Sequence, residues 1–207
     1  MHISDGVLSP AVIGITSLLG AGTLAFSLRG IKTEEIPKIS LMTAVFLTGS
    51  TIHIPIGPTS MHLVLTGFIG LVTGRHAGVS IFIALLVQLF LLHFGGLSSL
   101  GANVLIESLP AMLLGMLLRP RLGNKAFLYG FMAGFLAILG SVLLLGILLI
   151  QSHLRFGMGP FSTVTTVIVG HIPLMFIEGL ITGFAIRFLV KIRPGFFTGN
   201  LQVMKGT

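Results

Sequence analysis

Cysteine and tryptophan are absent from this chain of 207 residues, and charged residues are scarce. Without cysteine the chain can form no disulfide bond, no thiolate metal site and no thiol nucleophile. Charged residues make up 8% of the chain, against about 25% in an average soluble domain, whereas 54% of its residues are hydrophobic. So few charged groups cannot cover a globule in water, so apolar surface must face lipid. The composition therefore predicts an integral membrane protein.

Acidic residues are scarcer still: the chain has 5 of them against 12 basic residues, which gives a net charge of +7. In a soluble protein this excess would suggest a nucleic-acid partner. In a membrane protein, however, basic residues flank the helices on the cytoplasmic side. We therefore expect a lipid bilayer and no nucleic acid as partner.

The apolar residues form seven segments, each bounded by charges, glycine or proline. We expect an all-α, seven-transmembrane-helix bundle that forms a single domain over residues 1–207, with the seven spans lying within 10–193. The spans are expected at about 10–28, 39–54, 61–73, 79–92, 104–118, 127–150 and 164–190. The third, fourth and fifth are short for a hydrocarbon core of roughly 30 Å, so their boundaries are the least well defined.

The basic residues indicate the orientation of this bundle. If the N-terminus lies outside, the outer loops contain only Arg155 of the basic residues. The inner side then holds the remaining basic residues, Arg29, Lys32, Lys38, Arg75, Arg119, Arg121, Lys125, Arg187, Lys191, Arg193 and Lys205. This bias follows the positive-inside rule. We expect the N-terminus outside and the C-terminus in the cytoplasm.

Small residues run along the first expected span, at Ser17, Ala21 and Ala25. This spacing lets helices approach closely. It is compatible with a docking face for a partner subunit and with packing inside the bundle.

Histidines gather on the expected outer side, which holds six of the seven: His2, His53, His62, His93, His153 and His171. A single histidine near a membrane interface is usually a hydrogen-bonded structural residue, but several on one face favour a cation or proton site. His153 lies beside Arg155 and is expected to be solvated. His171 is expected to be a polar anchor or a packing residue.

The start of the chain has metal-chelating chemistry. The α-amine of Met1, the backbone nitrogen of His2 and the imidazole Nδ1 of His2 can close two adjacent chelate rings in one plane. A fourth nitrogen would complete a square, the geometry typical of Ni(II) and Cu(II), whereas zinc prefers a tetrahedron. We expect Met1 to be retained because His2 is bulky. The alternative is an ordinary polar terminus in which Ser4 or Asp5 caps the first helix.

His62 is the best candidate for the fourth nitrogen. It follows the stretch "GPTS", in which Gly57 and Pro58 indicate a turn and Thr59 and Ser60 are candidate helix N-caps. We therefore expect His62 to open a helix at the outer mouth of the bundle.

Four stretches resemble segments of the CbiM/NikM family. They are "MHISDGVLS", "PIGPTSMHL", "HFGGLSSLGANV" and "HIPLMFIEGLITGFAIRFLVKIRP". They are spaced along nearly the whole length of the chain, from its first residue to Pro194. Pro58 departs from the pattern, since many members carry glycine there. The family members are nickel- and cobalt-specific substrate-binding (S) components of energy-coupling factor (ECF) transporters.

The resemblance implies a function, a ligand set and partners. Residues 1–9 would form a metal-binding segment in which Met1 and His2, together with His62, hold Ni(II) or Co(II) as transported substrate. The expected partners are a transmembrane T component, cytosolic ATPases and a small accessory membrane subunit. The chain itself would be no enzyme and would carry no cofactor. Relatives assigned to cobalt often read Met-Glu where this chain has Ser4-Asp5, which favours nickel; a cobalt-specific homologue serving cobalamin synthesis remains the alternative.

Further polar residues are expected around these ligands. Asp5 and Ser60 flank them, and Asn103 would either hydrogen-bond a ligand or tie loops together. Glu178 lies within the last span, where a carboxylate is costly unless it is paired, so we expect a structural or coupling role through helix-end amides. His93 is not expected to be a ligand, since many relatives lack histidine there, and Glu107 is a case similar to Glu178 with less support.

Two other classes of function are less consistent with these residues. An intramembrane metallohydrolase needs an open metal position and a general base, as in His-Glu-x-x-His, and the sequence contains no such pattern. An autonomous channel or permease usually carries ionisable residues in mid-membrane. Here the acidic residues within spans are Glu107 and Glu178, and Glu107 lies near the end of its span.

Overall fold

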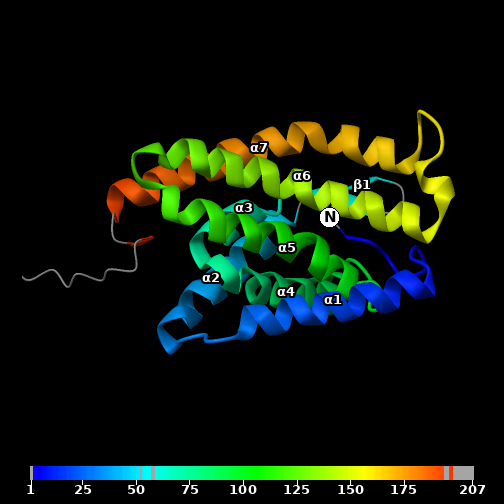
Figure 1. The fold of residues 1–207 in the computed structure, drawn as a ribbon, viewed down its shortest axis with the longest axis horizontal. Coiled ribbons are helices and arrows are strands. Elements are labelled where there is room, and N and C mark those ends of the chain that lie inside the picture. The colour runs from blue at the N-terminus through cyan, green and yellow to red at the C-terminus, as the bar shows by residue number, and fades with distance from the viewer. Residues whose placement is uncertain (1, 52, 57–58, 194–195, 198–207) are drawn as a thin grey trace, which may run out of the picture.

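The chain folds into a bundle of helices with one short β-hairpin. The computed structural model describes residues 2–51, 53–56, 59–193 and 196–197, with the side chains of 53–56 and 59–61 left aside. Its described α-helices are α1 (Pro10–Leu28), α2 (Ile36–Gly49), α3 (Thr66–Thr73), α4 (Ala77–Val87), α5 (Leu100–Leu118), α6 (Ala126–Ser152) and α7 (Thr163–Ile192). Strands β1 (His53–Ile56) and β2 (Thr59–His62) form the hairpin between α2 and α3 (Figure 1).

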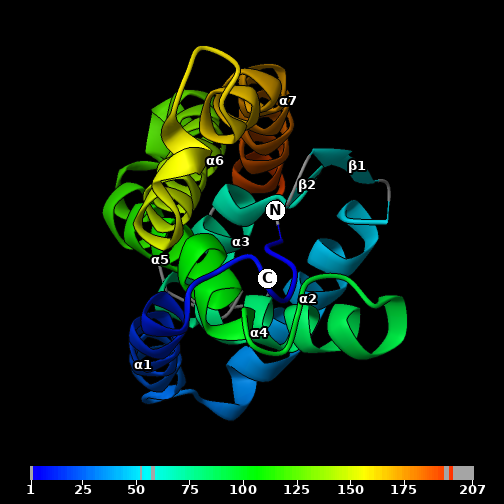
Figure 2. The ribbon, with the colours of Figure 1, turned by 90° about the vertical axis from the view of Figure 1, so that its right-hand side faces the viewer.

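Helix α5 lies at the centre of the bundle and packs against α1, α3, α4 and α6. The long helices α6 and α7 form an antiparallel pair along one side (Figures 1 and 2). Glycines bring this pair close together: a Cβ on Gly134 would lie 2.4 Å from the carbonyl oxygen of Glu178, and one on Gly130 2.9 Å from the Cα of Gly183. Such close backbone contact is typical of helices packed within a membrane.

Five helical stretches in the described residues are long and apolar enough to cross a membrane. They are Pro10–Leu28, Thr66–Leu92, Leu100–Arg121, Gly123–Ser152 and Thr163–Ile192. Large apolar side chains such as Leu18 (75% exposed) and Phe188 (62% exposed) cover the outside of these helices. The chain is therefore a helical multi-pass membrane protein, as the composition predicts.

Helices α3 and α4 fall within one of these stretches, but the chain reverses between them. Gly74 has a φ of +60° in the turn that joins them. Along α3, Gly70 meets Ala111 of α5. Along α4, Gly78 meets Met112, and Gly95 beyond it lies near Asn103. Helix α4 thus runs antiparallel to α5, while α3 starts in the middle of the bundle.

The prediction that His62 opens a helix, with Thr59 and Ser60 as its N-caps, is wrong. Residues Thr59–His62 form β2, in which His62 pairs with His53 and Ser60 with Pro55. The helix begins only at Thr66. Strand pairing satisfies the backbone groups that the capping side chains were expected to satisfy, because the apolar residues of this segment fold back as a hairpin instead of continuing a span. The expected turn residues Gly57 and Pro58 lie outside the described part of the chain.

The basic turns meet at one end of the bundle. The hydroxyl of Ser27, near the end of α1, donates to the carbonyl of Arg75 at 2.8 Å. His76 Nδ1 lies 2.6 Å from the carbonyl oxygen of Ser27, and its Nε2 lies 3.4 Å from Glu35. A cavity of about 340 Å³ at this end is lined by Lys32, Arg75 and Arg119, among other residues. The loop between α4 and α5 precedes α5 and so lies at the other end of this helix from Arg119, and the N-terminal segment is bonded to that loop.

Packing accounts for part of the small-residue stripe on α1. A Cβ on Gly20 would lie 2.5 Å from the carbonyl oxygen of Gly101, and one on Gly101 would lie 2.5 Å from the Cα of Ser17. This part of the stripe therefore lets α1 approach α5. The side chains of Ala21 and Ala25 remain exposed on α1.

Candidate metal centre

Two histidines that lie 60 positions apart in the sequence meet inside the protein. The ring centroids of His2 and His62 are 4.6 Å apart, with an angle of 40° between the ring planes. Each residue is only 3% exposed. The ring of Phe46 from α2 lies 6.4 Å from the ring of His62 in an edge-on arrangement. The N-terminal segment and the end of β2 therefore bring two buried imidazoles together, and imidazole nitrogen is a ligand suited to nickel, copper, zinc and iron.

Asn103 fixes the residue that follows His2. Its side-chain oxygen accepts a hydrogen bond from the backbone N–H of Ile3 at 2.8 Å. Its side-chain nitrogen donates to the carbonyl of the same residue at 3.1 Å. The hydroxyl of Ser99 donates to that carbonyl as well. Of the two roles that the sequence left open for Asn103, the structure shows the tie between segments: the chain start is bonded to the first turn of α5.

Asp5 ties the same segment to the loop that precedes α5. Its carboxylate accepts hydrogen bonds from the backbone N–H groups of Leu97 at 3.1 Å and Ser98 at 2.9 Å, and from the hydroxyl of Ser98. The Ser98 hydroxyl and these amides lower the pKa of Asp5 below its ordinary value, although partial desolvation opposes the effect. A Cβ on Gly96 would lie 2.2 Å from Oδ1 of Asp5, which explains why this loop carries glycine.

The lowered pKa of Asp5 gives a pH-dependent prediction. A carboxylate whose pKa is lower in the folded chain stabilises the fold above its unfolded pKa and loses this effect as the pH falls through the folded pKa. We expect Asp5→Asn to lower the melting temperature of the metal-free protein at pH 7, and the difference to shrink as the pH falls below the ordinary pKa of 3.8 and to vanish below the lower pKa of the folded chain. Glu34→Gln, which removes an exposed carboxylate in the loop between α1 and α2, controls for net charge. A difference that stays constant from pH 7 to pH 3 would contradict the assignment.

Glu178 behaves as the sequence suggested. It is fully buried in α7, and its Oε1 accepts hydrogen bonds from the backbone N–H groups of Val64 at 2.6 Å and Leu65 at 2.9 Å. These two residues lie immediately before α3, so the expected bonds to helix-end amides are confirmed. Glu107 is fully buried in α5.

The remaining histidines are spread over the protein. His153 is exposed beside Phe156, as expected for a solvated residue. His171 is buried in α7, and its Nδ1 lies 2.7 Å from the carbonyl oxygen of Val167, as expected for an anchor within the helix. His93 is exposed and ends the helical stretch after α4 with a φ of +55°. Neither His153 nor His93 belongs to the His2–His62 pair.

Two of the expected site residues lie beyond what the structure describes. Met1 and the side chain of Ser60 fall outside the described part of the chain, so their roles remain predictions. Within that part, no group of three or more His, Cys, Asp or Glu side chains could hold a metal ion. The expected site needs no such group, because only two of its ligands are side chains.

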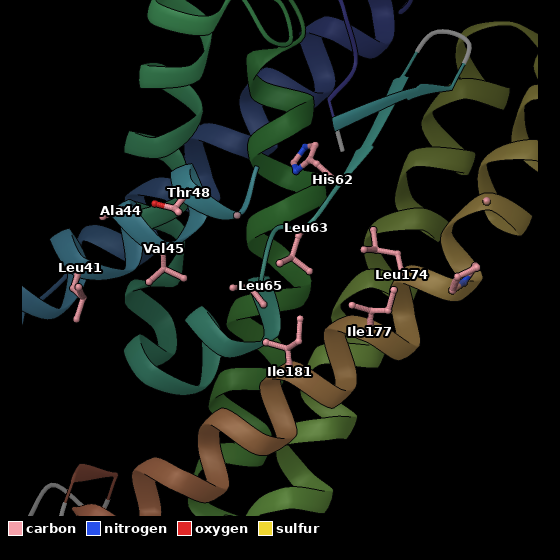
Figure 3. A pocket seen from close by; sticks show the side chains of 13 residues that line it. Leu41, Ala44, Val45, Thr48, His62, Leu63, Leu65, Leu174, Ile177 and Ile181 are labelled. Carbon is pink, nitrogen blue, oxygen red and sulfur yellow. The ribbon is translucent and has the colours of Figure 1, made fainter. Parts of the chain in front are cut away.

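A cavity of about 880 Å³ opens beside His62 (Figure 3). Val45 and Thr48 of α2 and Ile177 of α7 line its walls, and Leu63 and Leu65 lie between the two helices. Its lining is almost entirely apolar. A cation gains no ligands from such a lining, so the cavity itself is not the metal site.

Sequence reasoning missed some residues that support this centre. Ser99 and the left-handed Leu65 were not singled out, although Ser98 and Ser99 stand within the glycine-rich stretch "GGLSSLGAN". A serine pair between glycines before a helix is a signal for loop and capping bonds. Nothing in the sequence marks the backbone conformation of Leu65.

Comparison with known proteins agrees with this architecture. The family described as "cobalt uptake substrate-specific transmembrane region", CbiM, matches residues 2–196. A metal transport protein of Haemophilus influenzae, so named provisionally, is 32% identical, over 94% of this chain and 95% of its own. A provisionally named fused nickel transport protein NikMN of Archaeoglobus fulgidus is 26% identical, over 94% of this chain and 67% of its own. The crystal structure of a truncated transition metal transporter superposes with a TM-score of 0.80 at 20% identity, over 93% of this chain and 99% of the other. The chain belongs to the CbiM family of cobalt uptake transmembrane proteins.

Proposed function

We propose that this protein captures Ni(II), or alternatively Co(II), from outside the membrane as the S component of an ECF transporter. The observation that carries the proposal is the pair of buried imidazoles, His2 and His62, with ring centroids 4.6 Å apart at the start of the chain. The metal is the transported substrate. The chain performs no catalysis, and ATP hydrolysis belongs to its partners.

The proposed ligands are four nitrogens: the amine of Met1, the backbone nitrogen and imidazole of His2, and the imidazole of His62. His2 supplies two of them, so its position decides the geometry of the site. Asn103 holds Ile3 through hydrogen bonds to its N–H and its carbonyl, and Asp5 anchors the segment beyond it. These bonds prearrange the segment before the metal arrives, which lowers the conformational cost of binding.

A square of nitrogens accounts for the choice of metal. This geometry suits Ni(II), and Co(II) can enter the same ligand set. The comparisons support both metals, since the family is described by cobalt uptake and the Archaeoglobus relative is named for nickel. Ser4 and Asp5 stand where relatives assigned to cobalt often carry Met-Glu, so we favour nickel.

The two ends of the bundle suggest the orientation. The end at which Lys32, Arg75 and Arg119 meet is rich in basic residues. His2 precedes Ile3, which is bonded to the first turn of α5, whereas Arg119 follows the last turn of α5, so the His2–His62 pair lies away from the basic end. The positive-inside rule then places the N-terminus outside and the C-terminus in the cytoplasm, which requires seven crossings. In this arrangement α2 and the short α3 count as crossings although they span only part of the bilayer.

The proposed partners are a transmembrane T component, cytosolic ATPases and a small accessory membrane subunit. The fused nickel transport protein of Archaeoglobus is longer than this chain and supports the idea that such transporters combine several parts. The proposal predicts that the chain alone binds metal but does not accumulate it.

Uptake of radioactive nickel into cells tests the transport role. Cells that produce the chain together with T component and ATPases are expected to accumulate nickel. Cells in which the ATPases carry an inactivating change of the phosphate-binding lysine are expected to fall to background, while the purified chain still binds Ni(II). Equal accumulation by cells that produce the chain alone would indicate an autonomous permease and contradict the S-component role.

A further inference from the structure

The backbone between His62 and α3 adopts a conformation that its residues disfavour. Leu65 has φ +55° and ψ +29°, in the left-handed helical region. A side chain with a Cβ crowds the following carbonyl there, so the region is populated mainly by glycine, asparagine and aspartate. Leu65 therefore needs support from its surroundings to hold this turn.

Side-chain packing gives Leu65 little of that support. Leu65 is only half-buried, and it lines the 880 Å³ cavity between α2 and α7 (Figure 3). From the α2 side the backbone is held closely, since a Cβ on Gly49 would lie 2.9 Å from the carbonyl oxygen of Leu63. The support on the α7 side must come from a different contact.

Hydrogen bonds donated to Glu178 provide that contact. A single oxygen, Oε1, accepts from both Val64 N–H and Leu65 N–H, at 2.6 and 2.9 Å. Among the described residues, Oε2 has no hydrogen-bond partner. Oε1, the carboxylate oxygen that forms these bonds, thus accepts both of them from the turn at Leu65. A carboxylate in a membrane span is costly, which favours a specific role for it.

Glu178 lies in a part of α7 that packs closely against α6. The backbone of Glu178 lies against Gly134 of α6, where a Cβ would approach its carbonyl oxygen to 2.4 Å. Gly179 likewise packs against Phe131, at 2.9 Å for a Cβ. Because α6 and α7 are closely packed, the helix pair fixes the position of the Glu178 carboxylate. The carboxylate in turn fixes the position of the turn at Leu65.

We propose that Glu178 is a positioning residue for metal capture: it latches the left-handed turn at Leu65 to α7 and thereby holds the imidazole of His62 beside His2. The inference rests on the proposed function, since it assigns His62 as a ligand. In this role the acceptor oxygen of Glu178 matters, and its negative charge does not.

Three variants separate this role from others. Glu178→Leu removes the acceptor and is expected to weaken Ni(II) binding by about 10–100-fold, the usual effect of losing a group that orients a ligand. Glu178→Gln keeps an oxygen at the same place and is expected to bind as the unaltered chain does. Leu65→Gly in the Glu178→Leu background is expected to restore binding, because glycine adopts the left-handed turn without a latch. Glu34→Leu, at an exposed site, is the matched control.

Titration calorimetry and the visible absorption of bound Ni(II) measure the outcome. Unchanged binding by Glu178→Leu would overturn the latch, as would a Glu178→Gln variant as weak as Glu178→Leu or a double variant that is not restored. If Glu178→Leu does not fold, the double variant decides: folding and binding support the latch, and failure to fold contradicts it. Absence of Ni(II) binding by the unaltered chain would instead refute the proposed function itself.

Discussion

His62→Ala is expected to abolish stoichiometric Ni(II) binding. The imidazole of His62 is the proposed fourth nitrogen, and it lies buried against the ring of His2. Its removal leaves the proposed square one nitrogen short. We expect the affinity to fall by more than about 100-fold, beyond the loss that follows when only an orienting group is removed.

Isothermal titration of the purified protein in detergent measures this loss. His153→Ala is the matched control, because His153 is exposed and lies outside the pair. It is expected to bind Ni(II) as the unaltered chain does. Equal affinities for His62→Ala and His153→Ala would show that the metal binds elsewhere. His2→Ala is expected to lose binding as well, although it keeps the amine and the backbone nitrogen.

The long apolar spans could be predicted from the sequence alone. Helix α1 begins at Pro10 and ends at Leu28, where Arg29 and Gly30 interrupt the apolar run. Helices α6 and α7 also lie close to their expected ranges. Hydropathy is reliable here because a helix that faces lipid must satisfy its own backbone and remain apolar throughout.

The region between α2 and α3 could not be predicted in the same way. This region is rich in apolar residues, yet His53–Ile56 and Thr59–His62 form the two strands of a hairpin and Leu65 adopts a left-handed turn. Irregular backbone is tolerated at membrane depth where protein surrounds it. Hydropathy does not distinguish such a buried segment from a helix, so the second expected span is too long and the third begins too early.

The centre itself was partly visible in the sequence. His2 and His62 were singled out from ligand chemistry, and the structure brings their rings together. The alternative roles for Asn103 could not be separated, because only the fold shows that Ile3 lies within reach of α5. Glu178 was expected to bond helix-end amides, but the partner segment lies 113 positions away and could not be named.

The amine of Met1 is the proposed ligand that most distinguishes this site from an ordinary pair of histidines. A short extension before Met1, such as two glycines, would convert this amine into an amide while leaving both histidines in place. An amide nitrogen joined on both sides cannot replace the terminal amine without losing its proton and changing the chelate ring. Because the amine is the proposed ligand at one corner of the square, we expect the extended protein to lose stoichiometric Ni(II) binding entirely.

Two further measurements distinguish the loss of a ligand from the loss of the folded structure. The melting temperature of the extended protein without metal is expected to match that of the unaltered chain, because the hydrogen bonds that Asn103 and Asp5 accept still hold the segment. Cleavage of the extension by a protease that leaves Met1 as the first residue is expected to restore binding.

Titration of Ni(II) into the extended and the cleaved protein side by side is therefore the most direct test. We expect no stoichiometric binding before cleavage and one bound Ni(II) per chain after it. Tight binding that is the same before and after cleavage would contradict a metal site built on the start of the chain.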